Sequence, residues 1–387
     1  MPDLRPSPGF PVVGMVGGGQ LARMTQPAAV ALGVRLRVLA EAADASAAQV
    51  VPDAPVGDHR DAAAVTAFAE GCDVLTFDHE HVPTDLLVAL EGRGVAVRPG
   101  SSALVHAQDK AAMRARLAAL GLPQPRWRVV SDAAELAAHA DEVGWPLVLK
   151  TPRGGYDGKG VLVVRDLADA QEWLARTAGA GLLAEELVPY RRELAALVAR
   201  SPSGQAAAWP VVETVQVDGV CREVVAPAPG LAEDLALTAT QVALRVAGEL
   251  GVVGVLAVEM FETEDGRVLV NELAMRPHNS GHWTIDGAVT SQFEQHLRAV
   301  LDLPLGDPQA RAPWSVMVNV LGGEYEDLYR SYLHVMARDP GVKVHLYGKA
   351  VRPGRKVGHV TVVGNDLEDC RARARHAADF ITGLIDE

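Results

Sequence analysis

Two glutamates occupy matching places on either side of a turn. The largely apolar runs 252–261 and 267–272 flank Glu264-Asp265-Gly266, which predicts a β-hairpin. If Asp265-Gly266 is a two-residue turn, Glu259 lies opposite Glu272, with Cβ atoms about 5 Å apart. Like charges so placed need a cation, and carboxylates suit Mg²⁺ shared with phosphate oxygens, with Asn271 as a further neutral ligand. In the alternative, the register differs and one glutamate is merely solvated.

A glycine-dense segment follows the strand-like run Pro146–Lys150. The stretch 154–160 holds four glycines, which let a backbone approach phosphates closely. Lys150 and Lys159 add point charges for triphosphate oxygens. Because a strand is expected on each side, the segment predicts a hairpin flap rather than a Walker loop, which needs a following helix and a Lys-Ser/Thr pair. The alternative is a flexible, exposed hairpin.

Two further clusters could hold an anionic substrate. The stretch 276–282 is dense in polar donors and leaves the second glutamate strand, which predicts a substrate-binding loop. Alternatively, His278 and His282 cap local turns or are buried. A basic patch surrounds the turn Pro353-Gly354 and would suit a phosphate ester, although a solvated basic turn is also possible. Its members are Lys349, Arg352, Arg355 and Lys356.

Another glycine cluster lies near the N-terminus. Gly17–Ala22 follows the strand-like run Val12–Val16 and fits the pattern G-x-G-x-x-A, with Glu41 near the offset of a ribose contact. Three interpretations remain open: a dinucleotide site, a phosphate or other substrate site, and plain turn geometry.

The composition restricts the class of protein. The 387 residues allow two or three domains of about 150 residues each. With 36 basic and 49 acidic residues, the formal charge of −13 argues against a nucleic-acid or anionic-membrane partner. Three widely spaced cysteines, expected to be reduced, and an N-terminal segment without the apolar core of a signal peptide predict a cytoplasmic protein. No apolar run approaches the ~18 residues of a membrane span.

At least two kinds of architecture must position these clusters. Strand-like runs at 12–16, 35–39, 73–77 and 95–98 alternate with helical patterns, which predicts a parallel α/β sheet that ends near Pro99–Ser102. A helix is expected over Asp109–Leu120. Later runs predict antiparallel strands and a closing helix from Leu367, so the expected fold class combines α/β and α+β. These runs are 193–200, 207–215, 252–261, 267–272, 316–320, 343–347 and 357–363.

These motifs, in this order, resemble the ATP-grasp superfamily and, within it, the N5-carboxyaminoimidazole ribonucleotide synthetase family. The resemblance runs from Val13 to about Val363. It implies an ATP-grasp fold with an N-terminal Rossmann-like (pre-ATP-grasp) domain and a C-terminal antiparallel-sheet domain. The implied domains are residues 1–108, a central lid domain at 109–188, and 189–387 with the closing helix.

The resemblance also implies a role for individual residues. ATP would contact Lys110, Lys150, Gly155, Tyr156, Asp157, Gly158, Lys159, Gly160, Glu185, Glu186, Leu187, Val188, Glu193, Gln216, Asn271 and Glu272. Mg²⁺ would lie on Glu259 and Glu272. The ribonucleotide and bicarbonate would face Gln20, Glu80, Tyr156, Arg276, His278, Asn279, Ser280, Lys349, Arg352 and Arg355, with Asp157, Arg276, His278 and Lys349 as catalytic residues. Gln216 stands where the family often has His.

The implied activity is the ATP- and bicarbonate-dependent carboxylation of 5-aminoimidazole ribonucleotide in purine biosynthesis, through carboxyphosphate. The expected partners are small molecules and a second copy of the chain in a homodimer. One alternative is a formate-dependent glycinamide ribonucleotide transformylase of the same superfamily; Gln20 disfavours it, because the formate-using relatives tend to carry an acid there. Another is a non-catalytic dinucleotide sensor built on Gly17 to Glu41.

Overall fold

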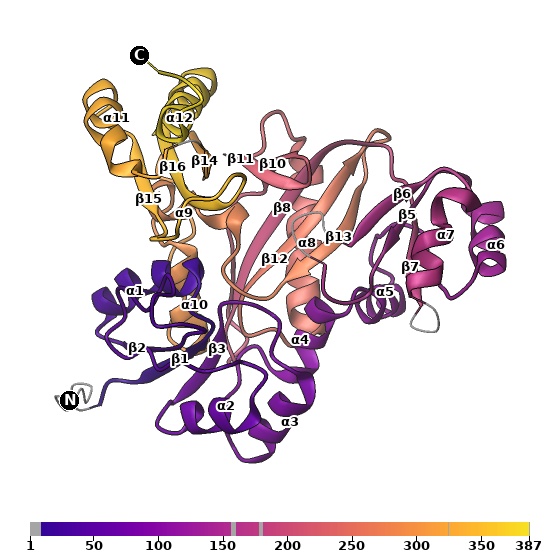
Figure 1. Ribbon diagram of the computed structural model, residues 1–387, viewed down its shortest axis with the longest axis horizontal. Coiled ribbons are helices and arrows are strands. Elements are labelled where there is room, and N and C mark those ends of the chain that lie inside the picture. The colour runs from indigo at the N-terminus through magenta and orange to yellow at the C-terminus, as the bar shows by residue number, and fades with distance from the viewer. Residues whose placement is uncertain (1–8, 156–159, 178–180, 324, 387) are drawn as a thin grey trace.

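A computed structural model describes residues 9–155, 160–177, 181–323 and 325–386. Within these residues the strands form three sheets of three, four and nine strands, called here the N-terminal, small and large sheets. In Figure 1 the N-terminal sheet lies at the lower left, the large sheet crosses the centre, and the small sheet lies at the right. Among the described helices, none combines the length and apolarity required to cross a membrane.

The N-terminal sheet is parallel, with strand order β2-β1-β3. Its strands are β1 (Val12–Val16), β2 (Arg35–Leu39) and β3 (Val74–Phe77). The helices between and after these strands are α1 (Gln20–Leu32), α2 (Ala62–Ala69), α3 (Thr84–Gly92) and α4 (Ser101–Gln108). The predicted fourth strand at 95–98 is wrong as a full strand, because it forms one isolated bridge, Leu75 to Val97. Since parallel strands end at one edge of a sheet, the segments after β1 and β3 meet there.

The small sheet has the order β4-β7-β5-β6, with antiparallel neighbours. Its elements are β4 (Trp127–Val130), α6 (Ala133–Val143), β5 (Leu147–Lys150), β6 (Val161–Val164), α7 (Leu167–Arg176) and β7 (Leu182–Glu186). Apolar side chains of α6 and α7 share one core cluster with the strands. The helix α5 (Lys110–Ala119) precedes this sheet and is capped by the Asp109 side chain, close to the predicted helix.

The large sheet is antiparallel, with the order β13-β12-β8-β10-β11-β14-β16-β15, and β9 pairs with β8. The strands are β8 (Tyr190–Arg200), β9 (Ala206–Ala208), β10 (Val212–Val217), β11 (Val220–Ala226), β12 (Gly254–Thr263), β13 (Val268–Ala274), β14 (Trp314–Leu321), β15 (Lys343–Leu346) and β16 (Lys356–Gly364). The helical segments are α8 (Glu233–Glu249), η1 (Asn279–Gly281), α9 (Thr284–Gly287), α10 (Gln292–Val300), η2 (Leu328–Ser331), α11 (Tyr332–Arg338) and α12 (Leu367–Thr382). The predicted antiparallel class and closing helix are therefore confirmed.

Helix α10 joins the N-terminal and large sheets. His296, fully buried on α10, accepts the backbone N–H of Val255 at 3.1 Å and lies 2.8 Å from the hydroxyl of Thr76 in β3. Burial lowers the pKa of His296 to about 4, so the ring is neutral at neutral pH and donates from Nε2 to the hydroxyl. The two sheets are thus held together by a buried polar contact as well as by apolar packing.

The hairpin β12–β13 has a different turn from the predicted one. The Thr263 N–H donates to the Arg267 carbonyl, so the loop has three residues, Glu264 to Gly266, and Glu262 pairs with Val268. A β-bulge then shifts the register beside Glu259, and Glu259 pairs with Glu272 as predicted. The extra turn residue and the bulge cancel each other.

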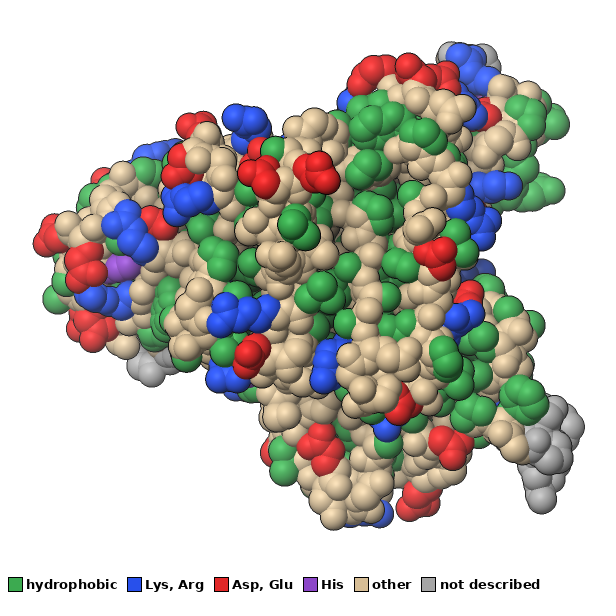
Figure 2. Space-filling model, turned by 180° about the vertical axis from the view of Figure 1, so that it is seen from behind, with side chains coloured by type: hydrophobic (Ala, Val, Ile, Leu, Met, Phe, Trp, Pro, Cys, Tyr) green, Lys and Arg blue, Asp and Glu red, His purple; other side chains and the backbone are tan. Residues whose placement is uncertain are grey.

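Acidic and basic side chains are interspersed on the face of the molecule shown in Figure 2.

Candidate active site

One cavity of about 1110 Å³ is lined by segments of all three sheets. Most of the predicted site residues line it: Gln20, Glu80, Lys110, Lys150, Gly155, Glu185, Glu186, Leu187, Val188, Glu193, Gln216, Glu259, Asn271, Glu272, Arg276, His278, Asn279, Ser280 and Lys349. Gly160, Arg352 and Arg355 do not line it, and both arginines are exposed. Tyr156, Asp157, Gly158 and Lys159 lie outside the described residues.

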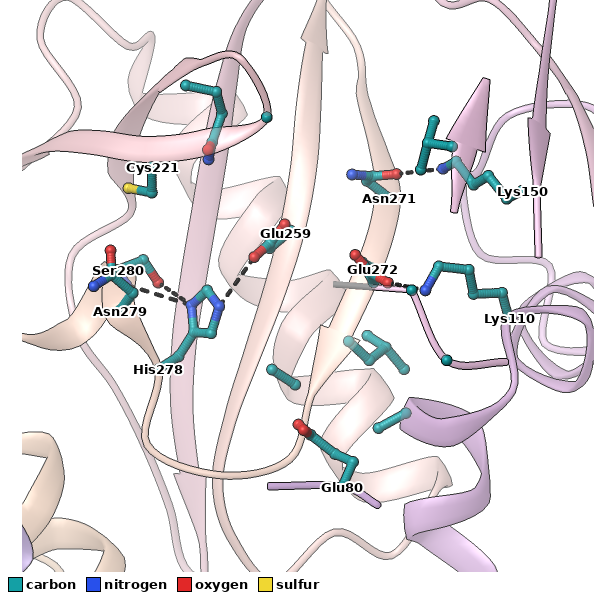
Figure 3. Close-up of a pocket in the computed structure, with 18 of the residues that line it drawn as sticks. Glu80, Lys110, Lys150, Cys221, Glu259, Asn271, Glu272, His278, Asn279 and Ser280 are labelled. Atoms are coloured by element: carbon teal, nitrogen blue, oxygen red, sulfur yellow. Dashed lines mark hydrogen bonds and ion pairs between the residues drawn. The ribbon is translucent and has the colours of Figure 1, made fainter. Parts of the chain in front are cut away.

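The two hairpin glutamates point into the cavity from neighbouring strands (Figure 3). Glu272 forms an ion pair with Lys110, and Glu259 lies 3.1 Å from His278 Nε2. Burial raises the pKa of Glu259, but the hydrogen bond from His278 and the charges of His278, Arg276 and Lys356 together outweigh it, so the pKa is lowered and the group is ionised. The bulge places Asn271 and Glu272 in succession against Glu259, and Asn271 also lines the cavity.

This donor set fits a magnesium ion only with help from a bound molecule. Among the described residues, no three His, Cys, Asp or Glu side chains are grouped to hold a metal ion. Two carboxylates and one amide oxygen are, however, the hard ligands that Mg²⁺ takes when phosphate oxygens and water complete its shell. The residues therefore suit an ion that arrives with a nucleotide.

A buried ion network lies beside the carboxylate pair. Lys150 Nζ is 2.8 Å from Glu185 and donates to Asn271 Oδ1 at 3.0 Å. Arg114, fully buried on α5, also pairs with Glu185 at 2.6 Å and donates to the carbonyls of Val270 and Asn271. Burial alone would raise the pKa of Glu185, but the charges of Arg114 and Lys150 lower it to about 2. The Glu185 side chain is thus held by these two cations.

Glu193 and Gln216 lie on adjoining strands of the same wall. Burial, and then the nearby charge of Glu259, raise the pKa of Glu193 to about 7, although hydrogen bonds from Tyr190 and Gln216 oppose the shift. The Tyr190 hydroxyl donates to Glu193 at 3.3 Å, and the Tyr190 ring stacks on Phe261 with centroids 4.8 Å apart. A bulge in β10 falls at Gln216.

The other end of the cavity combines N-terminal and C-terminal residues. Lys349 donates to Gln20 Oε1 at 2.6 Å, and Arg276 pairs with Glu80 at 2.8 Å. Burial lowers the pKa of Lys349; the charge of Asp78 opposes this shift, and the charge of Arg355 adds to it. These contacts bring the N-terminal glycine cluster next to the predicted basic patch.

The glycine fingerprint does not have the surroundings of a dinucleotide site. Asp78 accepts the N–H groups of Gly19 and Ala22 at 2.7 and 2.9 Å, and Glu41 accepts that of Gly18 at 3.0 Å. Two carboxylates therefore occupy the helix N-terminus where a pyrophosphate would bind. Burial raises the pKa of Asp78 to about 6.

Several cavity residues were not predicted from the sequence. Asp78, His79 and His81 line the cavity next to Glu80, whereas Lys356, which also lines it, belongs to the predicted basic patch. The signal was present in part: residues 78–81 follow a strand of a parallel sheet, where ligand contacts concentrate. Arg114 gave no signal, because its role depends on partners 71 and 156 residues away.

Models of three protein families match successive parts of the chain. They are a ribonucleotide synthetase preATP-grasp domain over 11–108, an ATP-grasp domain over 115–293, and a phosphoribosylaminoimidazole carboxylase C-terminal domain over 315–373.

Relatives match over nearly the whole length. The N5-carboxyaminoimidazole ribonucleotide synthase of Mycobacterium tuberculosis is 58% identical over 96% of this chain and 88% of its own. The solved synthetase of Thermus thermophilus is 40% identical, with a TM-score of 0.86 over 97% of this chain and 99% of its own. The Aspergillus clavatus synthase, solved with ADP and 5-aminoimidazole ribonucleotide, is 33% identical, with a TM-score of 0.88 over 97% and 99%. On this evidence the chain belongs to the N5-carboxyaminoimidazole ribonucleotide synthase family of ATP-grasp ligases.

Proposed function

We propose that this protein carboxylates the amine of 5-aminoimidazole ribonucleotide, with ATP and bicarbonate as co-substrates, in purine biosynthesis. The observation that carries the proposal is that the cavity has two differently built ends. One end has Lys110, Lys150 and the paired glutamates, which suit a magnesium nucleotide. The other has Lys349 and Arg276, which suit a ribonucleotide phosphate and an anionic co-substrate.

The nucleotide end requires an exchange of ionic partners. Lys110 would leave Glu272 and His278 would leave Glu259 when the phosphates bind. Mg²⁺ held by Glu259 and Glu272 would neutralise charge that develops between the β- and γ-phosphates. Lys150 stays anchored by Glu185, so its charge is already directed along the cavity wall. Glu185–Val188 would meet adenine through backbone groups, and Glu193 would meet the ribose hydroxyls.

The chemistry then follows in three steps. A bicarbonate oxygen attacks the γ-phosphorus of ATP, which gives carboxyphosphate and ADP. Carboxyphosphate divides into CO₂ and phosphate, and the amine nitrogen attacks the carbon of CO₂ and loses a proton. The phosphate released with CO₂ takes this proton, and His278 Nε2, freed as Glu259 changes partner, would donate a hydrogen bond to an oxygen of the reacting anions. The protein mainly orients the reactants and excludes water from the intermediate.

Three further parts of the proposal concern the setting of the enzyme. We expect the protein to act in the cytoplasm on small molecules, without nucleic acid or membrane, and as a homodimer. The formate-dependent transformylase remains the second candidate for the activity, although the named relatives act on the imidazole compound.

ADP release by the purified protein tests the proposal. It should require Mg²⁺, bicarbonate and 5-aminoimidazole ribonucleotide together, and omission of any one should reduce the rate to background. Formate with glycinamide ribonucleotide should not replace the last two. ADP release with formate but not with bicarbonate would refute the proposed carboxylation.

A further inference from the structure

The loop 276–282, which carries Arg276 and His278, winds around one buried side-chain amide. Gln292 is the first residue of α10 and is fully buried. Its Oε1 accepts the N–H of His278 at 2.8 Å, and its Nε2 donates to the carbonyl of the same residue at 2.8 Å. The Gln292 amide therefore binds the His278 backbone at two points, as a neighbouring β-strand would.

The same amide defines the state of a second histidine. Gln292 Nε2 lies 3.0 Å from His282 Nδ1. The backbone N–H of His278 can only donate, so Oε1 faces it and the amide nitrogen faces His282. His282 Nδ1 must then accept, which requires a neutral ring with its proton on Nε2. Burial lowers the pKa of His282 well below its usual value, in agreement with a neutral ring.

A second buried amide holds the loop from the large sheet. Asn319 on β14 is 2% exposed and exchanges two hydrogen bonds, of 3.0 and 2.7 Å, with Asn279. Its Nδ2 also donates to the carbonyl of Cys221 at 2.9 Å. Asn279 was predicted to bind substrate, but these two bonds occupy much of the hydrogen-bonding capacity of its amide.

The loop has little space to move between these two amides. A Cβ atom added at Gly281 would collide with Gln292 Oε1 and with Leu197. The buried hydroxyl of Thr284 accepts the N–H of Gln292 at 2.9 Å and donates to the Gly281 carbonyl at 2.6 Å. Neither Gln292 nor Asn319 lines the cavity, so both act on the loop from behind.

We propose that Gln292 and Asn319 are positioning residues for the ribonucleotide half of the reaction, because they fix the loop backbone that presents His278 to the reacting centre. The inference rests on the proposed function. The loop is preorganised by two carboxamides that touch no substrate, as residues behind a binding site orient the side chains that contact the ligand. Loss of either amide contact should displace His278 from Glu259 without disturbing the lysines of the nucleotide end.

Helix α10 supplies a matched control. Gln295 is also fully buried and also binds a backbone residue at two points, since it accepts the N–H of Gly306 at 2.7 Å and donates to its carbonyl at 2.8 Å. Neither Gln295 nor Gly306 lines the cavity. Gln292→Glu and Gln295→Glu therefore make the same chemical change on one helix, and they differ in the loop that loses its donor.

The test compares the two variants by steady-state ADP release and thermal melting. Gln292→Glu should lower kcat/KM for the ribonucleotide by about tenfold or more, with KM for ATP within about twofold of the parent. Gln295→Glu should lower the Tm comparably and leave both kinetic constants within about twofold. Equal kinetic losses in the two variants, or parental kinetics in Gln292→Glu, would overturn the inference.

Asn319→Asp provides a second approach from another element if Gln292→Glu fails to fold. It keeps the shape of the side chain but places an acceptor against Asn279 Oδ1 and the Cys221 carbonyl, so the same kinetic pattern is expected. A parental KM for the ribonucleotide in this variant would contradict the role of Asn319.

If the parent protein itself releases no ADP that depends on the ribonucleotide, the proposed function fails, and the inference fails with it. If the parent is active and the Gln292 variant resembles the Gln295 variant, the inference alone fails.

Discussion

Glu259 and Glu272 face each other across one hairpin, yet each has a cation from another part of the chain beside it. That arrangement explains why two carboxylates tolerate one another on a partly exposed wall: Lys110 and His278 offset the repulsion, a role that the proposed metal nucleotide would take over. The residue types and their spacing were enough to predict the pair. Their cationic partners could not be predicted, because they come from a helix and a loop that only the tertiary fold brings near.

Substitution of Glu272 tests this assignment. Glu272→Gln keeps the shape but loses the charge, and kcat for ADP release should fall by about a hundredfold, the scale of one major electrostatic contact. Glu264→Gln, in the exposed turn of the same hairpin, is the control and should retain parental activity. Near-parental turnover in Glu272→Gln would argue against a metal on this hairpin.

Glu193 gives a prediction about pH. Its folded-state pKa of about 7 lies above the ordinary 4.5, so the native state favours the protonated acid. The stability from this group is fully present below about pH 4.5 and is lost as the pH rises to about 7. Glu193→Gln removes the titration, so its Tm relative to the parent protein should rise between pH 5 and pH 8. A constant difference in Tm over that range would contradict the shifted pKa of Glu193.

Several secondary elements were predictable from the sequence, but their register was not. The strand runs and the closing helix appear close to the expected places because apolar periodicity and glycine-rich turns are local signals. The pairing of Glu259 with Glu272 was correctly predicted from an incorrect turn, since a bulge at the metal-facing end restored the register. A bulge depends on packing across neighbouring strands, so the sequence of one hairpin does not reveal it.

The contact between α5, β7 and β13 supports a stability prediction. Arg114→Met would leave Glu185 buried with one cationic partner fewer, and the carbonyls of Val270 and Asn271 would lose their donors. Removal of one partner from a buried ion pair costs about 3–5 kcal/mol, so the free energy of unfolding by urea should fall by that amount. Arg116→Met, two residues along the same helix and only partly buried, should cost less than about 1 kcal/mol. Similar losses in both variants would show that the network contributes little.

At the scale of the whole molecule, the site exists only because three sheets meet. The N-terminal segment 42–50 holds the strap 347–349: the Ser46 hydroxyl donates to the Tyr347 carbonyl at 2.6 Å, and Gln49 donates to the Gly348 carbonyl at 2.7 Å. This contact sets Lys349 opposite Gln20. The sequence separates the two sides by about 300 residues, so family resemblance, rather than any local pattern, predicted that they would meet.

Gly348 tests the importance of that junction. It has a φ of +64°, and a Cβ atom there would collide with Gln49. Gly348→Ala should raise KM for the ribonucleotide by about tenfold while KM for ATP stays within about twofold, because the displaced strap carries Lys349. Gly354→Ala has a similar φ of +74° but open space around it, so it isolates backbone strain and should leave KM unchanged. Equal kinetic effects of the two substitutions would mean that the junction does not orient Lys349.

The ion pairs Lys110–Glu272 and Arg276–Glu80 have a consequence for small inorganic anions such as phosphate and sulfate. An inorganic anion that entered the cavity would have to displace a carboxylate already paired with each of these cations. It would bring no metal ion or sugar whose contacts could compensate for the lost ion pair. A magnesium nucleotide and a sugar phosphate can compete, because each offers several contacts at once. In the resting protein, carboxylates of the chain itself compete with anionic ligands for these cations, and this competition disfavours the binding of simple salts.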